Sequence, residues 1–517
     1  MSVAQRWAIS LLCFITAVGF FVRIYHVDTN PAGFFCDEAS IGYNAYTLLT
    51  TGKDEHGTSL PVFFRSFGDY RTPIPFYTAI PFIALFGLSE LSVRLATVSV
   101  GTLTIVVLFL FIHRLFVVIN KERYAALAGL VGAGILAISP WHIHFSRFGS
   151  EYIYLPFFLL FAAWCFLESI HHRKMFILAS VLSIAICYTY LPGVILGPLF
   201  YVGSFFIILP YGKNSKHTVW LGIIIALLTF TPVLIAWQNK TLQTRWNNVE
   251  LEKTQPVASQ IQLFVSQYIS HFSPLFLFTK GDTEYPGHYM QRFGVRGQGQ
   301  IYLVDGIFVL LGIVFCILSM KRYPVMLFPL LILFLYPIGS SITKTDGGPF
   351  SFRSILGSIA FPIVSTIGIT LVFSLIRNKR VQLVLSLLIF LGYGISFGRY
   401  LYLYHTQYPL YSQDFAGWQF GPRDVMKTFL DNKGKYDEYL LIGEFNAPEI
   451  FLKFYDPTNI CQNKCRIAGV NDIHEDRSQL IAISPQSWQQ VPNLMLTVQK
   501  VIPYPNGQPA YYIATSR

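Results

Sequence analysis

The chain has 517 residues, of which 53% are hydrophobic and only 13% are charged. Soluble domains carry roughly 25% charged residues, so this composition, with its repeated apolar runs, excludes an ordinary soluble protein and indicates a polytopic membrane protein. The net charge of +11 does not indicate nucleic-acid binding, because the Lys and Arg residues gather in short loops between apolar runs, as the positive-inside rule predicts.

The first predicted span covers residues 7–27. Arg6 precedes it and no small-residue cleavage site follows, so we interpret it as an uncleaved anchor with a cytoplasmic N-terminus. Ten further spans follow if every Lys/Arg-rich loop stays on the cytoplasmic side. These are 91–112, 124–140, 150–170, 175–191, 192–210, 218–237, 301–320, 324–343, 354–376 and 381–402. Because the runs are continuous rather than alternating, they predict an all-α membrane protein with about 11 transmembrane helices.

This topology requires that residues 73–88 do not cross the membrane. The segment has 16 residues and three prolines, so we expect an interfacial or re-entrant helix there. The segments predicted to lie outside the cytoplasm are 28–90, 140–151, 238–300, 343–353 and 403–517.

The last of these segments has the composition of a globular domain. Alternating runs at 439–443 and 510–515 predict strands, and 423–432 predicts a helix. We therefore expect a transmembrane domain over 1–402 and a small extracytoplasmic α/β domain over 403–517. Its Cys461 and Cys465 are candidates for a disulfide if the region lies outside the cytoplasm, whereas a zinc site would need two further ligands.

The stretch EASIGYNAYTLLTTG in the first outer loop predicts a short amphipathic helix that ends at Gly52. Asp37 lies at or just before its N-terminus, where the helix dipole favours an ionised carboxylate. Asp37 is therefore a candidate base, and equally a candidate N-cap.

Other charged and polar residues also gather at the predicted outer membrane boundary. They cost a few kcal/mol there unless paired, so they are candidates for a functional site. Arg147 and Glu151 have an i,i+4 ion pair as the simpler alternative. The full candidate set is Asp37, Glu38, Asp69, Tyr70, Arg94, Arg147, Glu151, Lys344 and Arg353.

Carboxylates and arginines at a lipid–water interface suit the chemistry of a lipid-linked phosphosugar. Arginine recognises phosphate through a planar fork of donors. A carboxylate can take the proton of an acceptor hydroxyl that attacks the anomeric carbon, through a transition state of oxocarbenium character. A nearby cation stabilises the departing phosphate.

Three stretches that carry candidate residues are FFCDEASIGYNAYTLLTTGKD, FGDYRTPIPFY and ISPWHIHFSRFGSEYIYLPFF. They resemble motifs of the membrane-embedded GT-C glycosyltransferases, specifically glycosyltransferase family 39 and the protein O-mannosyltransferase-like group, and are also similar to the aminoarabinose transferase type. FFCDEASIGYNAYTLLTTGKD resembles the family's acidic pair in the first outer loop. FGDYRTPIPFY resembles its HPPL-type segment, without the His and with only one of the two prolines in place. The segments LSVRLATVSVG, ISPWHIHFSRFGSEYIYLPFF, HFSPLFLFTKGD and FGVRGQGQIYLVD continue the resemblance in order.

The resemblance implies an enzyme, an inverting glycosyltransferase that moves a hexosyl or pentosyl group from a polyprenyl-phosphate donor to an acceptor outside the cytoplasm: a protein, a glycolipid or a cell-envelope glycan. It implies that Asp37 is the catalytic base, that Glu38 is its neighbour and that Glu151 is a second acid. Arg94, Arg147 and Arg353 become candidates for structural pairing or phosphate contact. No set of metal ligands is evident, so neither a metal nor a cofactor is expected.

The resulting prediction is a multi-pass protein of a prokaryotic plasma membrane, with the active site and the C-terminal domain outside. The alternative is a transporter or flippase of lipid-linked sugars, for which inverted repeats and mid-span polar residues would be expected. A third class is a scaffold without enzymatic activity whose C-terminal domain binds a partner.

Overall fold

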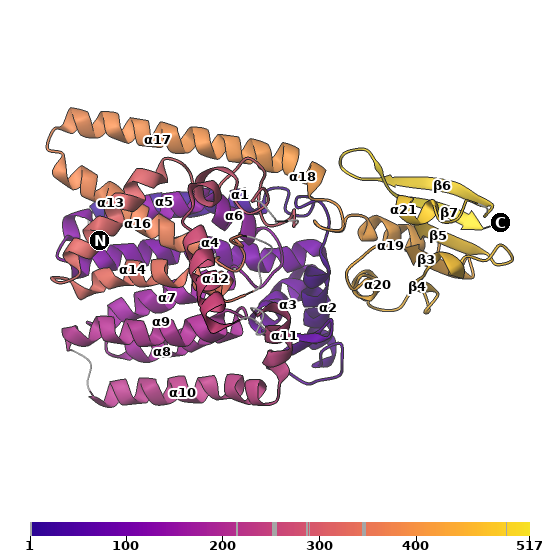
Figure 1. Cartoon of the computed structure of the whole chain (residues 1–517), viewed down its shortest axis with the longest axis horizontal. Helices are drawn as coiled ribbons and strands as arrows, with labels where there is room; N and C mark the ends of the chain where they lie inside the picture. The colour runs from indigo at the N-terminus through magenta and orange to yellow at the C-terminus, as the bar shows by residue number, and fades with distance from the viewer. Residues whose placement is uncertain are drawn as a thin grey trace.

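The computed structural model describes residues 3–212, 216–250, 256–285, 288, 290–343, 348–492 and 494–516. A bundle of long helices forms one part, and a small sheet with helices packed against it forms the other (Figure 1). Short helices and a hairpin lie where the two parts meet, and these elements carry the candidate site.

Seven helical segments of the described chain are long and apolar enough to cross a membrane. They are α1 (Val3–Ile24), α4 (Glu90–Val118), α9 (Gly193–Ile208) with its continuation to Tyr211, α10 (Lys216–Gln238), α14 (Leu327–Leu335) with α15 (Ile338–Ser341), α16 (Gly357–Leu375), and α17 (Lys379–Tyr402) continued through α18 (Tyr408–Tyr411).

The other predicted spans correspond to shorter or bent helices. Helices α5 (Glu122–Ile138) and α6 (Pro140–Ser146) meet at an angle of 60°. The remaining ones are α7 (Tyr154–Ser169), α8 (Lys174–Ala185) with its continuation to Tyr188, and α13 (Asp305–Ser319). The predicted helical membrane fold is confirmed, while the number of helices that cross the bilayer stays a prediction.

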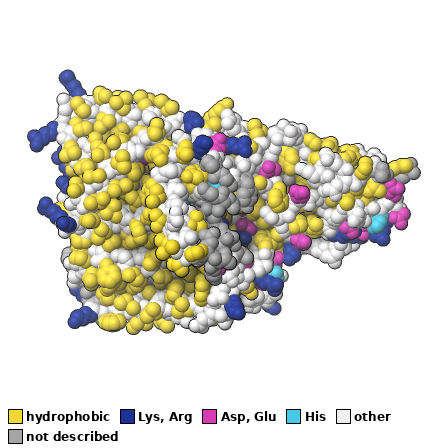
Figure 2. Space-filling view, in the orientation of Figure 1, with side chains coloured by type: hydrophobic (Ala, Val, Ile, Leu, Met, Phe, Trp, Pro, Cys, Tyr) yellow, Lys and Arg dark blue, Asp and Glu magenta, His cyan; other side chains and the backbone are white. Residues whose placement is uncertain are grey.

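Charge is distributed unevenly along the bundle. Figure 2 shows Lys and Arg side chains projecting from the end that lies away from the sheet, and apolar side chains covering the bundle between its ends. The loops between helices α4 and α5, α7 and α8, and α16 and α17 carry exposed Lys and Arg residues. This pattern is the one that the positive-inside rule predicts for a cytoplasmic face.

Helix α3 (Ile74–Phe86) occupies the segment that the sequence predicts not to cross. Its 13 residues measure about 20 Å at 1.5 Å per residue, which is less than the bilayer core of about 30 Å. It packs against α2 (Cys36–Thr51) and α4, beside the hairpin of β1 (Phe64–Ser66) and β2 (Asp69–Arg71). Helix α11 (Thr241–Val249) packs against β2, and α12 (Val257–Ser270) packs against α15.

The C-terminal part is a five-stranded mixed sheet with strand order β4-β3-β5-β7-β6. Strand β3 pairs in parallel with β4 and β5, whereas β7 pairs antiparallel with β5 and β6. Apolar clusters cover both faces of the sheet.

The strands are β3 (Glu438–Ile442), β4 (Cys465–Ile467), β5 (Gln479–Ile483), β6 (Leu496–Pro503) and β7 (Pro509–Ser516), and the helices are α19 (Pro422–Asp431), α20 (Glu449–Tyr455) and α21 (Pro485–Trp488). The predicted strands and helix coincide with β3, β7 and α19, while the domain boundary at 403 stays a prediction.

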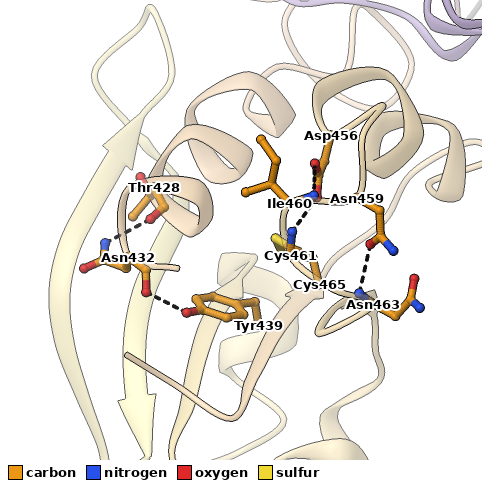
Figure 3. The surroundings of a disulfide bond; sticks show 9 residues. All are labelled: Thr428, Asn432, Tyr439, Asp456, Asn459, Ile460, Cys461, Asn463 and Cys465. Carbon is orange, nitrogen blue, oxygen red and sulfur yellow. Dashed lines mark hydrogen bonds between the residues drawn. A yellow bond between two sulfur atoms is a disulfide. The ribbon is translucent and has the colours of Figure 1, made fainter. Parts of the chain in front are cut away.

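Cys461, in the loop after α20, and Cys465, the first residue of β4, form a disulfide, which settles the pairing that the sequence left open (Figure 3). The Asp456 carboxylate accepts hydrogen bonds from the backbone N–H groups of Ile460 at 2.6 Å and Cys461 at 2.9 Å. These contacts and the disulfide hold the loop in a compact turn.

The C-terminal part packs directly on α2 and α4. A Cβ added at Gly42 of α2 would lie 2.5 Å from the ring of Phe454, so only glycine allows this approach of α20. Glu90, at the start of α4, accepts hydrogen bonds from Arg423 and Tyr455. The C-terminal part is therefore held against the bundle by an apolar contact at Gly42 and by the hydrogen bonds to the buried Glu90 carboxylate.

Candidate active site

Asp37 is the second residue of α2. The helix begins because the Glu38 carboxylate accepts a hydrogen bond from the backbone N–H of Phe35 at 3.2 Å, and it ends at Gly52, whose φ of 72° suits glycine. The N-cap position belongs to Phe35, so the alternative prediction of Asp37 as an N-cap is wrong. The Asp37 side chain is left for other contacts and keeps 24% of its surface exposed.

Asp37 is paired with Arg71 of the β1–β2 hairpin. The two terminal nitrogens of Arg71 donate to the two oxygens of Asp37 at 3.2 and 3.0 Å. The hairpin turns through Phe67 and Gly68, both with positive φ, as a two-residue turn of the I′ type requires. Side chains alternate along a strand, so Asp69 and Arg71 share one face and Tyr70 faces the other.

Two further carboxylates contact the same guanidinium. Glu151, in the corner that follows α6, lies 3.5 Å from Arg71, and Asp69 lies 3.6 Å from it. Arg245 of α11 reaches both of these acids, with its nitrogens 3.1 Å from Asp69 and 3.1 Å from Glu151. Three acids and two arginines, from four separate segments, thus form one cluster, which we call the acid–arginine cluster: Asp37, Asp69, Arg71, Glu151 and Arg245.

The electrostatic surroundings keep Asp37 ionised. Burial opposes ionisation, but the positive charges of Arg71, Arg245 and Arg292 outweigh it, so the pKa of this carboxyl lies below its ordinary value. Burial also disfavours the charged form of Arg71, yet Asp37, Glu151 and Asp69 raise the pKa of its guanidinium above the usual range. Asp37 is therefore an anion held among cations.

Arg292 is positioned by contacts on both its backbone and its side chain. Its carbonyl oxygen accepts hydrogen bonds from the Tyr408 hydroxyl and contacts His144 Nε2, both at 2.7 Å. Its guanidinium lies 3.9 Å from the centroid of the Phe35 ring, at the residue that caps α2. This cation–π contact places the charge beside the helix end that bears Asp37.

Glu38 lies in a different environment from its neighbour. Only 2% of its side chain is exposed, and its oxygens accept from Arg94 at 2.9 and 3.1 Å and from the Gly149 N–H at 2.7 Å. Arg94 also donates to backbone carbonyls of the loop that precedes α2, those of Val27, Pro31 and Gly33. These contacts favour a positioning role for Glu38 and Arg94 over the catalytic and substrate-binding roles expected of them.

Arg147 is likewise committed to the fold. Its nitrogens donate to four backbone carbonyls near the end of α1, and its Nε donates to the Tyr404 hydroxyl at 3.1 Å. The acceptors are Val22, Arg23, Tyr25 and Asn30. Because Glu151 pairs with Arg71 and Arg245 instead, the alternative of an ion pair between Arg147 and Glu151 is wrong.

Arg353 lies near the acid–arginine cluster, but none of its contacts among the described residues is with an acid of that cluster. It donates to Thr343 Oγ1 at 2.9 Å and stacks on the ring of Phe352, which in turn contacts Tyr152, the residue after Glu151. Lys344, the remaining candidate, lies outside the described residues.

Sequence reasoning did not single out Arg245 and Arg292, although the structure places both at the site. Both lie in the segment 238–300, which the sequence predicted to lie outside the cytoplasm but for which it predicted no helices. The only available signal was that each is an Arg in a segment predicted to face the same side as Asp37.

Solved structures match this fold over nearly all of its length. ArnT from Cupriavidus metallidurans in the apo state has a TM-score of 0.56 at 13% identity, covering 100% of this chain and 99% of that one. The same protein bound to undecaprenyl phosphate gives 0.55 at 13% identity, with 99% and 98% covered. The chain has the GT-C fold. The GT-C resemblance that the sequence motifs indicate is thereby confirmed.

Two further comparisons bear on this GT-C chain. The apo oligosaccharyltransferase of Archaeoglobus fulgidus has a TM-score of 0.55 at 14% identity, covering 87% of this chain and 64% of that one. The family model described as dolichyl-phosphate-mannose-protein mannosyltransferase matches residues 70–237, which include Tyr70 and Arg71 of β2, all of α4 and the corner that bears Glu151. No curated protein matches the chain in sequence.

Proposed function

We propose that this protein transfers one sugar from a polyprenyl phosphate to an acceptor hydroxyl outside the cytoplasm, with inversion at the anomeric carbon. The observation that carries the proposal is the position of the Asp37 carboxylate, which is partly exposed and paired with Arg71 at one end of the helical bundle. The nearby charges of Arg71, Arg245 and Arg292, which lower the pKa of Asp37, support it. The match to the mannosyltransferase family model supports the reaction class. Structural neighbours bound to undecaprenyl phosphate and to dolichol phosphate support the class of donor.

The reaction is a single displacement. Asp37 accepts the proton of the acceptor hydroxyl as its oxygen bonds to the anomeric carbon. The bond between that carbon and the phosphate oxygen breaks, and the electron pair leaves with the polyprenyl phosphate. Arg245 and Arg292 stabilise the charge that accumulates on this phosphate, because guanidinium groups bind phosphate oxygens through a planar fork.

The location of the charges supports an enzyme of the outer face over a transporter. The cluster lies on the side of the bundle that carries the C-terminal part, opposite the Lys/Arg-rich end (Figures 1 and 2). A transport path would instead require polar groups at the membrane midplane. The uneven charge also supports a plasma-membrane protein whose site and C-terminal part face outward.

The test is donor turnover by the purified protein in lipid nanodiscs. A panel of polyprenyl-phosphate hexoses and pentoses is supplied with envelope extract as the acceptor source, and released polyprenyl phosphate is measured. Asp37→Asn is expected to reduce the rate by about 100- to 10,000-fold, the contribution typical of a general base. Asp476→Asn, an exposed acid of the C-terminal part, is the matched control and should leave the rate unchanged.

An Asp37→Asn protein that turns over donor at the wild-type rate removes Asp37 from the role of base. The acceptor is identified separately, by mass spectrometry of envelope glycans and glycoproteins from cells with and without the protein.

A further inference from the structure

A groove runs along the helical bundle between α17 and three other helices. It encloses about 780 Å³ and is lined by residues of α1, α5, α16 and α17. Figure 1 shows α17 along one edge of the bundle, with its first residues at the end that lies away from the sheet. All of α17 is described, and only two of its 24 residues, Tyr393 and Tyr400, are buried. The first half of α17 therefore has little protein packed beneath it.

Helix α17 is tied to the bundle at two points along the groove. Near its start, the side-chain amide of Gln382 donates to the carbonyl oxygens of Phe373 and Ile376 at 3.2 and 2.8 Å. Farther along, the Tyr393 hydroxyl donates to Asp305 at 2.5 Å. These two ties lie about 16 Å apart at 1.5 Å per residue, and the groove separates the helix from the bundle between them.

The walls of the groove present apolar surface to an occupant, although some polar residues line it. Thr370 and Ser386 each donate to a backbone carbonyl of their own helix, both at 2.8 Å. With the two ties described above, these polar side chains are satisfied within the protein. The other lining residues are apolar, apart from Tyr124 and Lys379. An alkyl chain is therefore the occupant that these walls suit.

Positive charge gathers at one mouth of the groove. The exposed Lys379 lines the groove where α17 begins. From the opposite wall, Tyr124 lines the same space, and the guanidinium of Arg123 lies 5.8 Å from the centroid of its ring. The neighbouring acid, Glu122, does not line the groove. An anionic headgroup at this mouth would meet two cations while its chain enters the groove.

The length of the groove matches one leaflet of a bilayer. From Lys379 to Tyr393, α17 rises about 21 Å at 1.5 Å per residue. A bilayer of about 40–45 Å, headgroup regions included, has leaflets of about 20–22 Å. The groove thus reaches from the headgroup level to the region of the midplane, which suits the acyl chain of a phospholipid. The much longer chain of a polyprenyl phosphate would extend beyond it.

We propose that this groove binds one anionic phospholipid of the leaflet at the Lys/Arg-rich end of the bundle. One acyl chain fills the space beneath α17, and the phosphate lies against Lys379 and Arg123. The lipid completes the packing of α17, which protein contacts hold at the two ties. The described residues that line the groove include no member of the acid–arginine cluster, so the proposal does not depend on the function proposed above.

The experiment is native mass spectrometry of the full-length protein, purified in detergent and stripped of lipid. Phosphatidylglycerol and phosphatidylcholine with the same acyl chains are titrated in, and the wild type is expected to retain one phosphatidylglycerol in preference to phosphatidylcholine. Lys379→Gln is expected to weaken phosphatidylglycerol binding about fivefold, which corresponds to the loss of about 1 kcal/mol per cation. Arg380→Gln, an exposed neighbour that does not line the groove, is the matched control and should leave binding unchanged.

A second variant fills the groove itself. Gly134 lines the groove, and a Cβ added there meets nothing within 4 Å, so the side chain in Gly134→Leu enters the space of the acyl chain without a clash. Its binding of phosphatidylglycerol should fall at least tenfold. Gly394→Leu is the matched control, because Gly394 of α17 has equally open surroundings and does not line the groove.

A folded Gly134→Leu protein that retains phosphatidylglycerol as the wild type does overturns the proposal. Equal binding of the two phospholipids by the wild type also overturns it, as does displacement of phosphatidylglycerol by an equimolar amount of polyprenyl phosphate. If Gly134→Leu does not fold, the charge variants decide: weakening in Lys379→Gln alone supports the site, and equal weakening in Arg380→Gln refutes it. Because no turnover is measured, failure of the proposed function leaves these results unaffected.

Discussion

Neutralising the adjacent acids should have opposite effects: Glu38→Gln should lower the stability of the protein, whereas Asp37→Asn should slow transfer with little change in stability. Glu38→Gln removes one partner of a buried ion pair with Arg94, in which the side chains are 2% and 0% exposed. Breaking such a pair costs about 3–5 kcal/mol, because the remaining charge is left buried without compensation. Asp37→Asn changes a side chain that is 24% exposed, and Arg71 keeps its two other acids, so a cost below about 1 kcal/mol is expected.

These energies convert into melting temperatures. An unfolding entropy of about 2.1 cal/mol/K per residue gives about 1.1 kcal/mol/K for the whole chain, so Glu38→Gln should lower Tm by about 3–5 °C. Asp37→Asn should lower it by less than about 1 °C while abolishing transfer.

The assay is thermal unfolding in one detergent, paired with donor turnover on the same preparations. Glu38→Asp is the control for Glu38→Gln, because it keeps the charge and shortens the side chain by one carbon. The reasoning is refuted if Glu38→Gln melts with the wild type, or if Asp37→Asn loses stability and keeps its activity.

Three further outcomes follow from the described contacts. Arg245→Gln removes a charge that lowers the pKa of Asp37, so the acidic limb of the kcat/KM profile should move to higher pH. The wild type should stay active below the ordinary aspartate pKa of about 3.9, and the stability linked to this ionisation is lost only as the pH falls through the lower folded-state value. Arg423→Ala leaves a buried acid of α4 without its ion pair, at a cost of about 1–3 kcal/mol, so limited proteolysis between the bundle and the C-terminal part should accelerate roughly 5- to 150-fold. Thiol alkylation of the unfolded, unreduced protein should modify five cysteines and spare Cys461 and Cys465, as mass spectrometry of the peptides will show.

Each of these outcomes has a contrary result. An acidic limb that does not move in Arg245→Gln means that this arginine does not act on the base. Unchanged proteolysis of Arg423→Ala, with Lys427→Ala as the exposed control on the same helix, means that the ion pair does not hold the C-terminal part. Alkylation of all seven cysteines without reductant excludes the disulfide.

Local periodicity was sufficient to predict several of the helices and two of the strands. Helix α2 and its end at Gly52, helix α19 and strands β3 and β7 all follow from apolar spacing and turn residues in the sequence. Such signals depend on neighbours in the chain, so they can be read without knowing the fold. The bend between α5 and α6 also follows from a local signal, the Pro140 that begins α6.

The partners of the charged residues depended on tertiary structure instead. Asp37 and Glu38 are adjacent in sequence, but successive side chains on a helix point about 100° apart. One therefore faces Arg71 and the other faces Arg94. Arg245 reaches the cluster only because α11 packs beside β2, a contact between segments that lie far apart in the chain.

The close approach of Phe454 to Gly42 means that substitutions in the bundle and in the C-terminal part constrain one another. Helix α2 carries Asp37 at one end and receives the C-terminal part along its side, so a substitution that pushes α20 away also tilts the carboxylate. The C-terminal part can therefore diversify at its far strands, β6 among them, while its α20 surface must keep the shape that α2 imposes. Sequence differences among chains that share this packing are then expected to collect in the loops of the sheet that point away from α2.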